Sequence, residues 1–193
     1  MNALEWDELS CWGTSVKNLL ITGRPGIGKT TVVRGLLGGL EMSVGGFYTE
    51  EIRSGGARVG FRVIDLGGPQ GLLAHADPAR IGSAGRPPRV GKYRVDVEEF
   101  ERVGLGALER ALSASDVVVI DEIGKMELLS LRFRETVRRA LDSPKTVLGV
   151  IQQRPDPFLD AIRGRPDVRL ITVTLDNRDR LPSDLLAELT SGA

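Results

Sequence analysis

The chain has 193 residues, with 26 Lys or Arg against 26 Asp or Glu, so its formal net charge is zero. A balanced charge gives no reason to expect a basic surface that binds nucleic acid or an acidic membrane. The length suits one domain with a sizeable core. The single cysteine, Cys11, cannot form an internal disulfide and by itself is a poor metal site.

The first residues of the chain differ in character from the rest. Residues 1–15 are acidic and hold no basic region followed by an apolar stretch, as a secretion signal would. No apolar run approaches the roughly 20 residues that a membrane-spanning helix needs. We therefore expect a cytoplasmic monomer without a membrane partner, in which residues 1–15 are an N-terminal extension and residues 16–193 form a single domain.

The first half of the chain begins with a strand, a turn and a helix. The apolar run 18–22 predicts a buried strand, and residues 30–40 predict a helix that ends near Gly38 and Gly39. Two β-rich runs, 45–53 and 60–66, are separated by Ser-Gly-Gly-Ala and predict a hairpin attached to the main sheet. Residues 67–92 are rich in Gly, Pro and Arg without a lasting period, so we expect a long surface loop there.

The second half alternates strands with helices. Residues 96–115 have apolar residues at helical spacing, and Asp96 with Glu99 resembles a capping box. The continuous apolar run 116–124 predicts a strand that is buried on both faces. We then expect a helix at 131–143, a strand at 146–151, a short helix at 156–164 capped by Asp156, a strand at 168–175 and a helix at 183–189. This alternation predicts an α/β fold class with three layers and a mostly parallel sheet.

Residues 23–30, GRPGIGKT, match the phosphate-binding pattern G-x-x-x-x-G-K-[ST] between a predicted strand and a predicted helix. Glycines allow turns that aim backbone N–H groups at a polyphosphate, and the helix N-terminus adds the positive end of its dipole. Lys29 would reach the β- and γ-phosphates. The hydroxyl of Thr30 would coordinate Mg²⁺, the cofactor that such a site predicts.

Two acids at the end of the strand 116–124 supply the expected partner of this turn. Asp121 would hold the Mg²⁺ shell, and Glu122 would orient or deprotonate an attacking water. A solvated acid at a strand end is the simpler alternative for Glu122. Residues 121–124 also spell D-x-x-G, a GTPase pattern, but the chain has no N-K-x-D guanine motif. We therefore favour an ATPase-type site with a catalytic glutamate.

Other polar residues are weaker candidates. His75 lies beside Asp77 in the predicted loop, where a solvated histidine is the commoner case. Gln152 follows the strand 146–151 and could sense the γ-phosphate, while Asn177 and Arg178 follow the last strand and could touch a base or begin a turn. The cations around the predicted loop could form a lid over the phosphates or a solvated face; they are Arg80, Arg86, Arg89, Lys92 and Arg94.

Several motifs together resemble one known family. ITGRPGIGKTT, GGFYTEEIR, GFRVIDL, VGKYRVDVEEFE, VVVIDEIGKMEL and DNRD occur in this order. They are similar to the THEP1 family of nucleoside-triphosphatases over about residues 17–189. The resemblance implies a RecA-like P-loop NTPase fold related to nucleotide kinases. It also implies Mg²⁺-dependent hydrolysis of ATP, GTP, CTP and UTP to diphosphates, with broad base tolerance. Such tolerance would follow if most of the affinity comes from the phosphates.

The same resemblance implies two nucleotide-contacting stretches. With Thr31 added at the start of the helix, the candidate residues are Gly23, Arg24, Pro25, Gly26, Ile27, Gly28, Lys29, Thr30, Thr31, Val117, Val118, Val119, Ile120, Asp121, Glu122, Ile123 and Gly124.

Two other functions remain open for the same motifs. A phosphotransferase would bind a nucleoside, a nucleotide or an RNA end under the arginine-rich loop and would exclude water until that acceptor closes it. An NTP-controlled binding module would order residues 67–92 with nucleotide and recruit a partner. Nucleic acid is otherwise not indicated as a partner.

Overall fold

The computed structural model describes residues 17–83 and 85–191, and its centre is a single twisted sheet. The strands of that sheet are β1 (Asn18–Thr22), β2 (Val44–Ser54), β3 (Ala57–Asp65), β4 (Gln70–His75), β5 (Arg89–Val90), β6 (Tyr93–Val95), β7 (Val117–Ile123), β8 (Thr146–Ile151) and β9 (Val168–Thr172). Their spatial order is β5-β6-β4-β3-β2-β7-β8-β1-β9. The order shows that segments far apart in the chain, such as β1 and β8, become neighbours.

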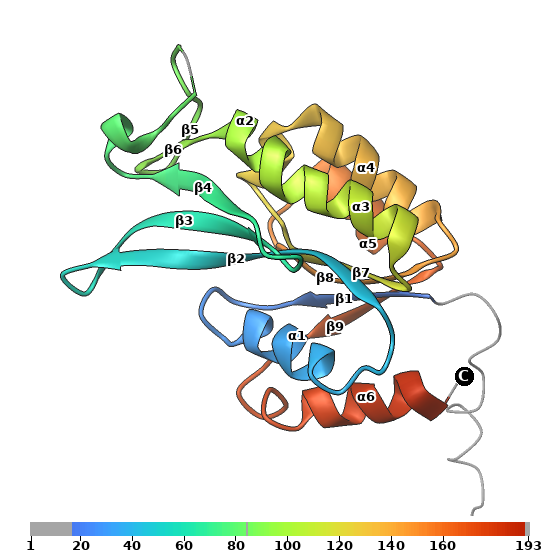
Figure 1. Cartoon of the computed structure of the whole chain (residues 1–193). Helices are drawn as coiled ribbons and strands as arrows, with labels where there is room; N and C mark the ends of the chain where they lie inside the picture. The colour runs from blue at the N-terminus through green and yellow to red at the C-terminus, as the bar shows by residue number, and fades with distance from the viewer. Residues whose placement is uncertain (1–16, 84, 192–193) are drawn as a thin grey trace, which may run out of the picture.

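The sheet has a parallel part and an antiparallel part. Parallel pairing joins β2, β7, β8, β1 and β9 in that order, whereas β2, β3, β4, β6 and β5 pair antiparallel. We call β3, β4, β5 and β6, together with the outer half of β2, the arm. Figure 1 shows the β2–β3 hairpin of the arm projecting away from the helices.

Helices cover both faces of the parallel part (Figure 1). One face carries α1 (Lys29–Leu37) and α6 (Leu181–Ser191), and the other carries α2 (Val97–Phe100), the π-helical turn η2 (Glu101–Leu105), α3 (Gly106–Ala114), α4 (Leu131–Asp142) and α5 (Pro157–Arg163). Short 3₁₀ turns lie at η1 (Pro78–Arg80) and η3 (Glu127–Leu129). The α/β class with three layers and an attached hairpin is therefore confirmed.

Two hydrophobic clusters explain why the central strands are apolar throughout. Leu20 of β1 and Ile120 of β7 belong to the cluster under α3 and α4, while their neighbours Ile21 and Val119 belong to the cluster under α1. Successive side chains of a strand point to opposite faces, so a strand covered on both sides needs an uninterrupted apolar run. β2 approaches β7 so closely that a Cβ at Gly46, where φ is +119°, would lie 2.1 Å from the carbonyl oxygen of Val119.

Most predicted elements are present, and the interpretation of residues 67–92 as one long loop is wrong. β4 lies inside that segment and pairs antiparallel with β3 through its backbone, as Gly60 opposite His75 shows. β5 pairs with β6 at the outer edge of the sheet. The apolar run of β4 is only three residues long, between Gly71 and His75, so the sequence pattern does not reveal a strand that tertiary pairing creates.

Smaller differences concern the ends of elements. The helical segment 97–114 is interrupted by the π-helical turn η2, and β9 ends at Thr172 rather than at Leu175. Asp96 caps its helix as predicted, since its carboxylate accepts a hydrogen bond of 3.0 Å from Glu99 N. The proposed extension 1–15 lies outside the described residues. Within the part of the chain that the structure describes, no helix is both long enough and apolar enough to span a membrane.

Candidate functional site

The turn between β1 and α1 curls around its own interior. Gly23, Gly26 and Gly28 have φ values of +147°, +76° and +110°, which side chains rarely adopt. A Cβ at Gly23 would also lie 2.9 Å from the carbonyl oxygen of Val173. The Nζ of Lys29 donates to the carbonyl oxygens of Gly23 (3.0 Å) and Arg24 (3.1 Å), so the ammonium group lies across the mouth of the turn. This turn and the N-terminus of α1 make a receptor for an anion.

The buried carboxylate of Asp121, at the end of β7, faces this turn. Thr30 Oγ1 donates to Asp121 Oδ1 at 3.1 Å, and Thr49 N donates to Asp121 Oδ2 at 3.3 Å. Asp121 is only 1% exposed. Burial raises the pKa of Asp121 to about 7, although the hydrogen bonds from Thr49 and Thr30 oppose the shift. A cation beside this carboxylate would compensate its loss of hydration.

Glu122 stands on a distorted backbone at the end of β7. Its φ is +152°, the only positive φ of a non-glycine residue in the described ranges, and the register between β7 and β8 shifts between Asp121 and Ile123. Such strain costs on the order of 1–3 kcal/mol and is concentrated at functional sites. Gln152 Nε2 donates to Glu122 Oε1 at 2.6 Å. The register shift therefore places Glu122 at the same edge of the sheet as Asp121. The hydrogen bond from Gln152 holds its carboxylate there.

One cavity of about 750 Å³ joins these features. The predicted residues that line it are Gly23, Pro25, Gly26, Gly28, Lys29, Thr30, Thr31, Asp121, Glu122 and Gln152. Arg24, Ile27, Ile123 and Gly124 do not line it, and Val117, Val118, Val119 and Ile120 are buried inside β7. The cavity therefore lies at the carboxyl ends of β1, β7 and β8, where ligands of open α/β sheets bind.

Apart from Gln152, the weaker candidates do not line this cavity. Arg94 donates to the carbonyl oxygen of Pro87 at 3.2 Å, and with Arg86 it lines a separate cavity of about 280 Å³, because β6 carries it to the arm. Asn177 uses its amide inside its own loop, bonding Thr174 N and Thr172 O. Arg178 lies near Gly28 and pairs with Asp179 at 3.5 Å. His75, Arg80, Arg89 and Lys92 do not line the cavity either.

Sequence reasoning missed part of the cavity wall. The additional lining residues are Arg34, Thr49, Glu50, Glu51, Arg58, Phe61, Lys125, Val150, Gln153 and Arg154. Thr49, Glu50 and Glu51 lie in GGFYTEEIR, and Lys125 lies in DEIGKMEL, so the family motifs were the available signal. Phe61 lies in GFRVIDL, another of those motifs, and the β2–β3 hairpin brings it to the cavity.

A second buried acid lies beside the site. Glu127 of η3 is 3% exposed. Burial raises the pKa of Glu127 well above its ordinary value, and the negative charge of Glu122 raises it further. A carboxyl group with a raised pKa stays protonated at pH values at which a solvated one has lost its proton. Its place in DEIGKMEL was the only signal in the sequence.

Comparisons with known proteins agree with this geometry. A family model described as NTPase matches residues 18–186. The nucleoside-triphosphatase THEP1 of Thermofilum pendens is 53% identical over 183 residues, which cover 92% of this chain and 97% of that protein. The chain belongs to the THEP1 family of nucleoside-triphosphatases. The family model and these relatives are named for the hydrolysis of nucleoside triphosphates.

Other relatives extend the likeness in sequence and in structure. The human cancer-related nucleoside-triphosphatase is 41% identical over 185 residues, covering 88% of this chain and 95% of that protein. The crystal structure of THEP1 from Aquifex aeolicus superposes with a TM-score of 0.77 at 37% identity, covering 89% of this chain and 98% of that one. The fold and the family thus rest on nearly the whole length of the chain.

Proposed function

We propose that residues 16–193 form one cytoplasmic, monomeric domain that hydrolyses ATP, GTP, CTP and UTP in a Mg²⁺-dependent reaction. The observation that carries this proposal is the meeting of Lys29, Asp121 and Glu122 in one cavity, from elements distant in the chain. A phosphate receptor, a buried carboxylate and an oriented acid are the parts that NTP hydrolysis needs.

The residues present fit a magnesium ion. Thr30 and Asp121 offer hard oxygen ligands that already contact each other at 3.1 Å, and a cation there would favour the ionised form of the buried Asp121 carboxyl. The described residues contain no cluster of three or more His, Cys, Asp or Glu side chains that could hold a metal. Mg²⁺ does not require such a cluster, because it takes few protein ligands and completes its shell with water and phosphates. When bound, Mg²⁺ supplies positive charge that neutralises the phosphate oxygens.

The chain's own residues carry the remaining chemistry. The backbone of residues 23–28 and Lys29 bind and orient the triphosphate. Glu122, held by Gln152 at 2.6 Å, orients water and takes its proton as the water oxygen bonds to the γ-phosphorus. The bond from that phosphorus to its bridging oxygen breaks, and the electron pair leaves with the nucleoside diphosphate.

Broad base tolerance is supported by the charges of the outer cavity wall. Glu50 pairs with Arg34 at 2.7 Å, and Glu51 pairs with Arg58 at 2.7 Å. Because these four side chains already pair with one another, they do not need a base as a hydrogen-bond partner. Discrimination between bases is strong only where unpaired polar groups of a site demand a partner.

The test is a turnover profile over the four NTPs, with and without Mg²⁺, using Lys29→Ala as the blank. We expect phosphate release that needs Mg²⁺ and that varies by less than about tenfold between bases. Release that continues in excess EDTA would contradict the role of Mg²⁺. A single accepted base would contradict the tolerance.

A kinase reaction is the second candidate, because the same cavity extends to Phe61 and Arg58 of the arm. An aromatic ring and a guanidinium are groups that bind a phosphorylated or aromatic acceptor. Nucleosides, nucleoside monophosphates and RNA ends should be screened with γ-labelled ATP. Label on an acceptor that appears faster than free phosphate would favour the kinase over the hydrolase.

A further inference from the structure

The segment that follows β8 enters the cavity between its two chemical ends. β8 lies between β7, which carries Glu122, and β1, which leads into the P-loop. Residues 152–154 follow β8 directly, and Gln152, Gln153 and Arg154 all line the cavity. A side chain on this segment is therefore positioned between the phosphate receptor and the acid that orients water.

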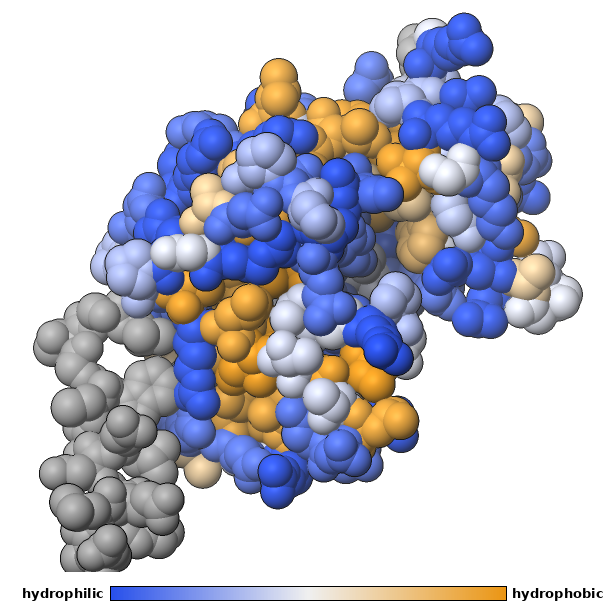
Figure 2. Space-filling model, turned by 180° about the vertical axis from the view of Figure 1, so that it is seen from behind, coloured by the Kyte–Doolittle hydropathy of each residue, from blue (hydrophilic) through white to orange (hydrophobic). Residues whose placement is uncertain are grey.

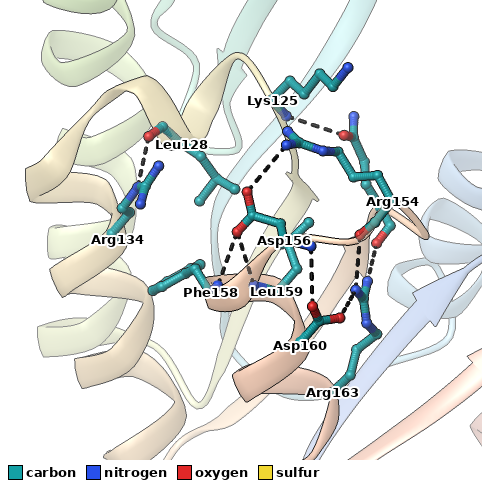
Figure 3. Close-up of polar contacts among 10 residues, drawn as sticks. Lys125, Leu128, Arg134, Arg154, Asp156, Phe158, Leu159, Asp160 and Arg163 are labelled. Carbon is teal, nitrogen blue, oxygen red and sulfur yellow. Dashed lines mark hydrogen bonds and ion pairs between the residues drawn. The ribbon is translucent and has the colours of Figure 1, made fainter.

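The main chain of this segment is fixed by one partly buried arginine. Arg163 of α5 donates from Nη1 to the carbonyl oxygen of Gln152 (2.5 Å) and from Nη2 to that of Arg154 (2.9 Å). Asp160 accepts from the same Nη2 at 2.6 Å, and the Arg163 side chain is only 17% exposed. Figure 3 shows this guanidinium below the segment, away from the side chain of Arg154. Arg163 thus fixes the backbone and leaves Arg154 available to the cavity.

The ion pair of Arg154 is weak by its geometry. Arg154 Nη2 lies 3.3 Å from Asp156 Oδ2, and its side chain is 36% exposed. Asp156 is already the N-cap of α5, because its Oδ1 accepts from Phe158 N at 3.0 Å and from Leu159 N at 3.4 Å (Figure 3). If the guanidinium moved to a phosphate, Asp156 would keep these partners. The exchange would leave no unpaired buried charge.

The other arginines of the cavity are held more firmly. Arg34 pairs with Glu50 at 2.7 Å and stacks on the ring of Tyr48 at 4.4 Å. Arg58 bonds Glu51 at 2.7 Å and the hydroxyl of Tyr93 at 3.1 Å, and these contacts raise the pKa of Arg58. Moving either one would break two favourable contacts. Among the arginines that line the cavity, Arg154 is therefore the one that a phosphate can recruit most easily.

We propose that Arg154 is this chain's own arginine finger: its guanidinium exchanges Asp156 for the transferred phosphoryl group and neutralises the charge that develops there. A planar guanidinium matches two phosphate oxygens at once, which a lysine cannot do. Arginine fingers come either from the same chain or from a partner. Here the geometry assigns the finger to the same chain, with Arg163 as the positioning residue. The inference rests on the hydrolysis proposed above.

The first experiment measures steady-state kinetics of Arg154→Ala and Arg154→Gln with Mg²⁺ and ATP. We expect kcat to fall by about 10²–10³-fold, with KM changed by less than about threefold, because the contact forms only as charge develops. Arg154→Gln keeps a polar side chain near Asp156, so it serves if the alanine variant does not fold. Arg154→Lys should recover less than about a tenth of the activity. The matched control is Arg138→Ala, an exposed arginine of α4 paired with Glu135.

The second experiment separates a finger from the same chain from one that a partner copy donates. Wild-type protein by itself should trap nucleoside diphosphate with aluminium fluoride, and Arg154→Ala should not. Chains carrying Arg154→Ala are then mixed with chains carrying Lys29→Ala, which retain Arg154 but lack the P-loop lysine. Their mixture should hydrolyse no more ATP than the two proteins measured separately.

Each outcome decides between distinct possibilities. Unchanged kcat in Arg154→Ala, beside active wild type, overturns the role of Arg154 and leaves the proposed hydrolysis standing. Restored activity in the mixture overturns the assignment to the same chain. Wild-type protein that releases no phosphate with Mg²⁺ refutes the proposed function itself.

Discussion

The parallel part of the sheet and the arm are built on different burial patterns. All five residues of β1 are buried, and so are six of the seven residues of β7. In β3 of the arm only Gly60, Val63 and Asp65 are buried. Figure 2 shows mainly hydrophilic side chains on the arm and more apolar surface on the body. Helices exclude water from both faces of the parallel part, whereas the arm is covered less completely.

This difference separates two tasks. The strands of the parallel part are covered on both faces. They hold Asp121, Glu122 and Lys29 of the turn 23–30 within hydrogen-bonding distance of their partners. The arm adds a wall of Glu51, Arg58 and Phe61 at the outer side of the same cavity. We therefore expect substitutions in the parallel part to change the chemical step, and substitutions in the arm to change substrate binding.

The largest effect is expected for Lys29→Ala. Its ammonium donates to two carbonyl oxygens of the turn, and Lys29 is not part of the core under α1, so its removal should leave that core intact. We expect kcat/KM for ATP to fall by about 10³-fold or more, with the melting temperature nearly unchanged. The control is Lys92→Ala, a lysine of the arm that stacks on Tyr93. Equal losses in both variants would remove the distinction between the two parts of the sheet.

Glu122→Gln comes next. The amide oxygen can still accept the hydrogen bond from Gln152, but the side chain can no longer take a proton from water. Turnover should fall by about 10²–10⁴-fold while the affinity for a non-hydrolysable triphosphate stays the same. Exposed Glu98→Gln is the control. Full hydrolysis by Glu122→Gln would show that Glu122 does not act as the general base.

A smaller effect is expected from Arg58→Ala in the arm. This variant removes a cation from the cavity wall together with its contacts to Glu51 and Tyr93. We expect KM for ATP to rise about threefold to tenfold, with kcat within about twofold of wild type. Arg53→Ala is the matched control, because Arg53 pairs with the same Glu51 but does not line the cavity. A large loss of kcat would assign chemistry to the arm.

The smallest effect concerns the pH dependence of stability. Burial, with the charge of Glu122 second, raises the pKa of Glu127 above its ordinary value of 4.5. Above that value the unfolded chain binds fewer protons than the folded one, so this group makes stability fall as pH rises toward its folded pKa. Glu127→Gln removes this contribution.

Urea unfolding at pH 5 and pH 8 checks this expectation. The variant should gain about 1 kcal/mol or more relative to wild type between the two pH values. Exposed Glu135→Gln should follow wild type at both. If Glu127→Gln also follows wild type, the carboxyl group of Glu127 is not held protonated by its surroundings.

The regular elements of the parallel part could be predicted because their signals are local. The apolar run of β7 and the Asp156–Pro157 start of α5 lie within a few residues of sequence. β4 was missed because its pairing with β3, and not its own composition, makes it a strand. The shift at Glu122 was missed for a related reason. A positive φ at a glutamate arises from the register against β8, and no residue pattern near Glu122 encodes it.

For the candidate site, the sequence by itself pointed to the glycine turn and to the acids Asp121 and Glu122, which line one cavity, because backbone geometry and charge follow from residue type at fixed spacing. The tertiary structure decided what surrounds them. It brought Thr49 to Asp121, Gln152 to Glu122 and Arg154 to the cavity, and it carried Arg94 away to the arm. These outcomes depend on which strands become neighbours, and strand order is fixed by burial over the whole sheet rather than by any short stretch of sequence.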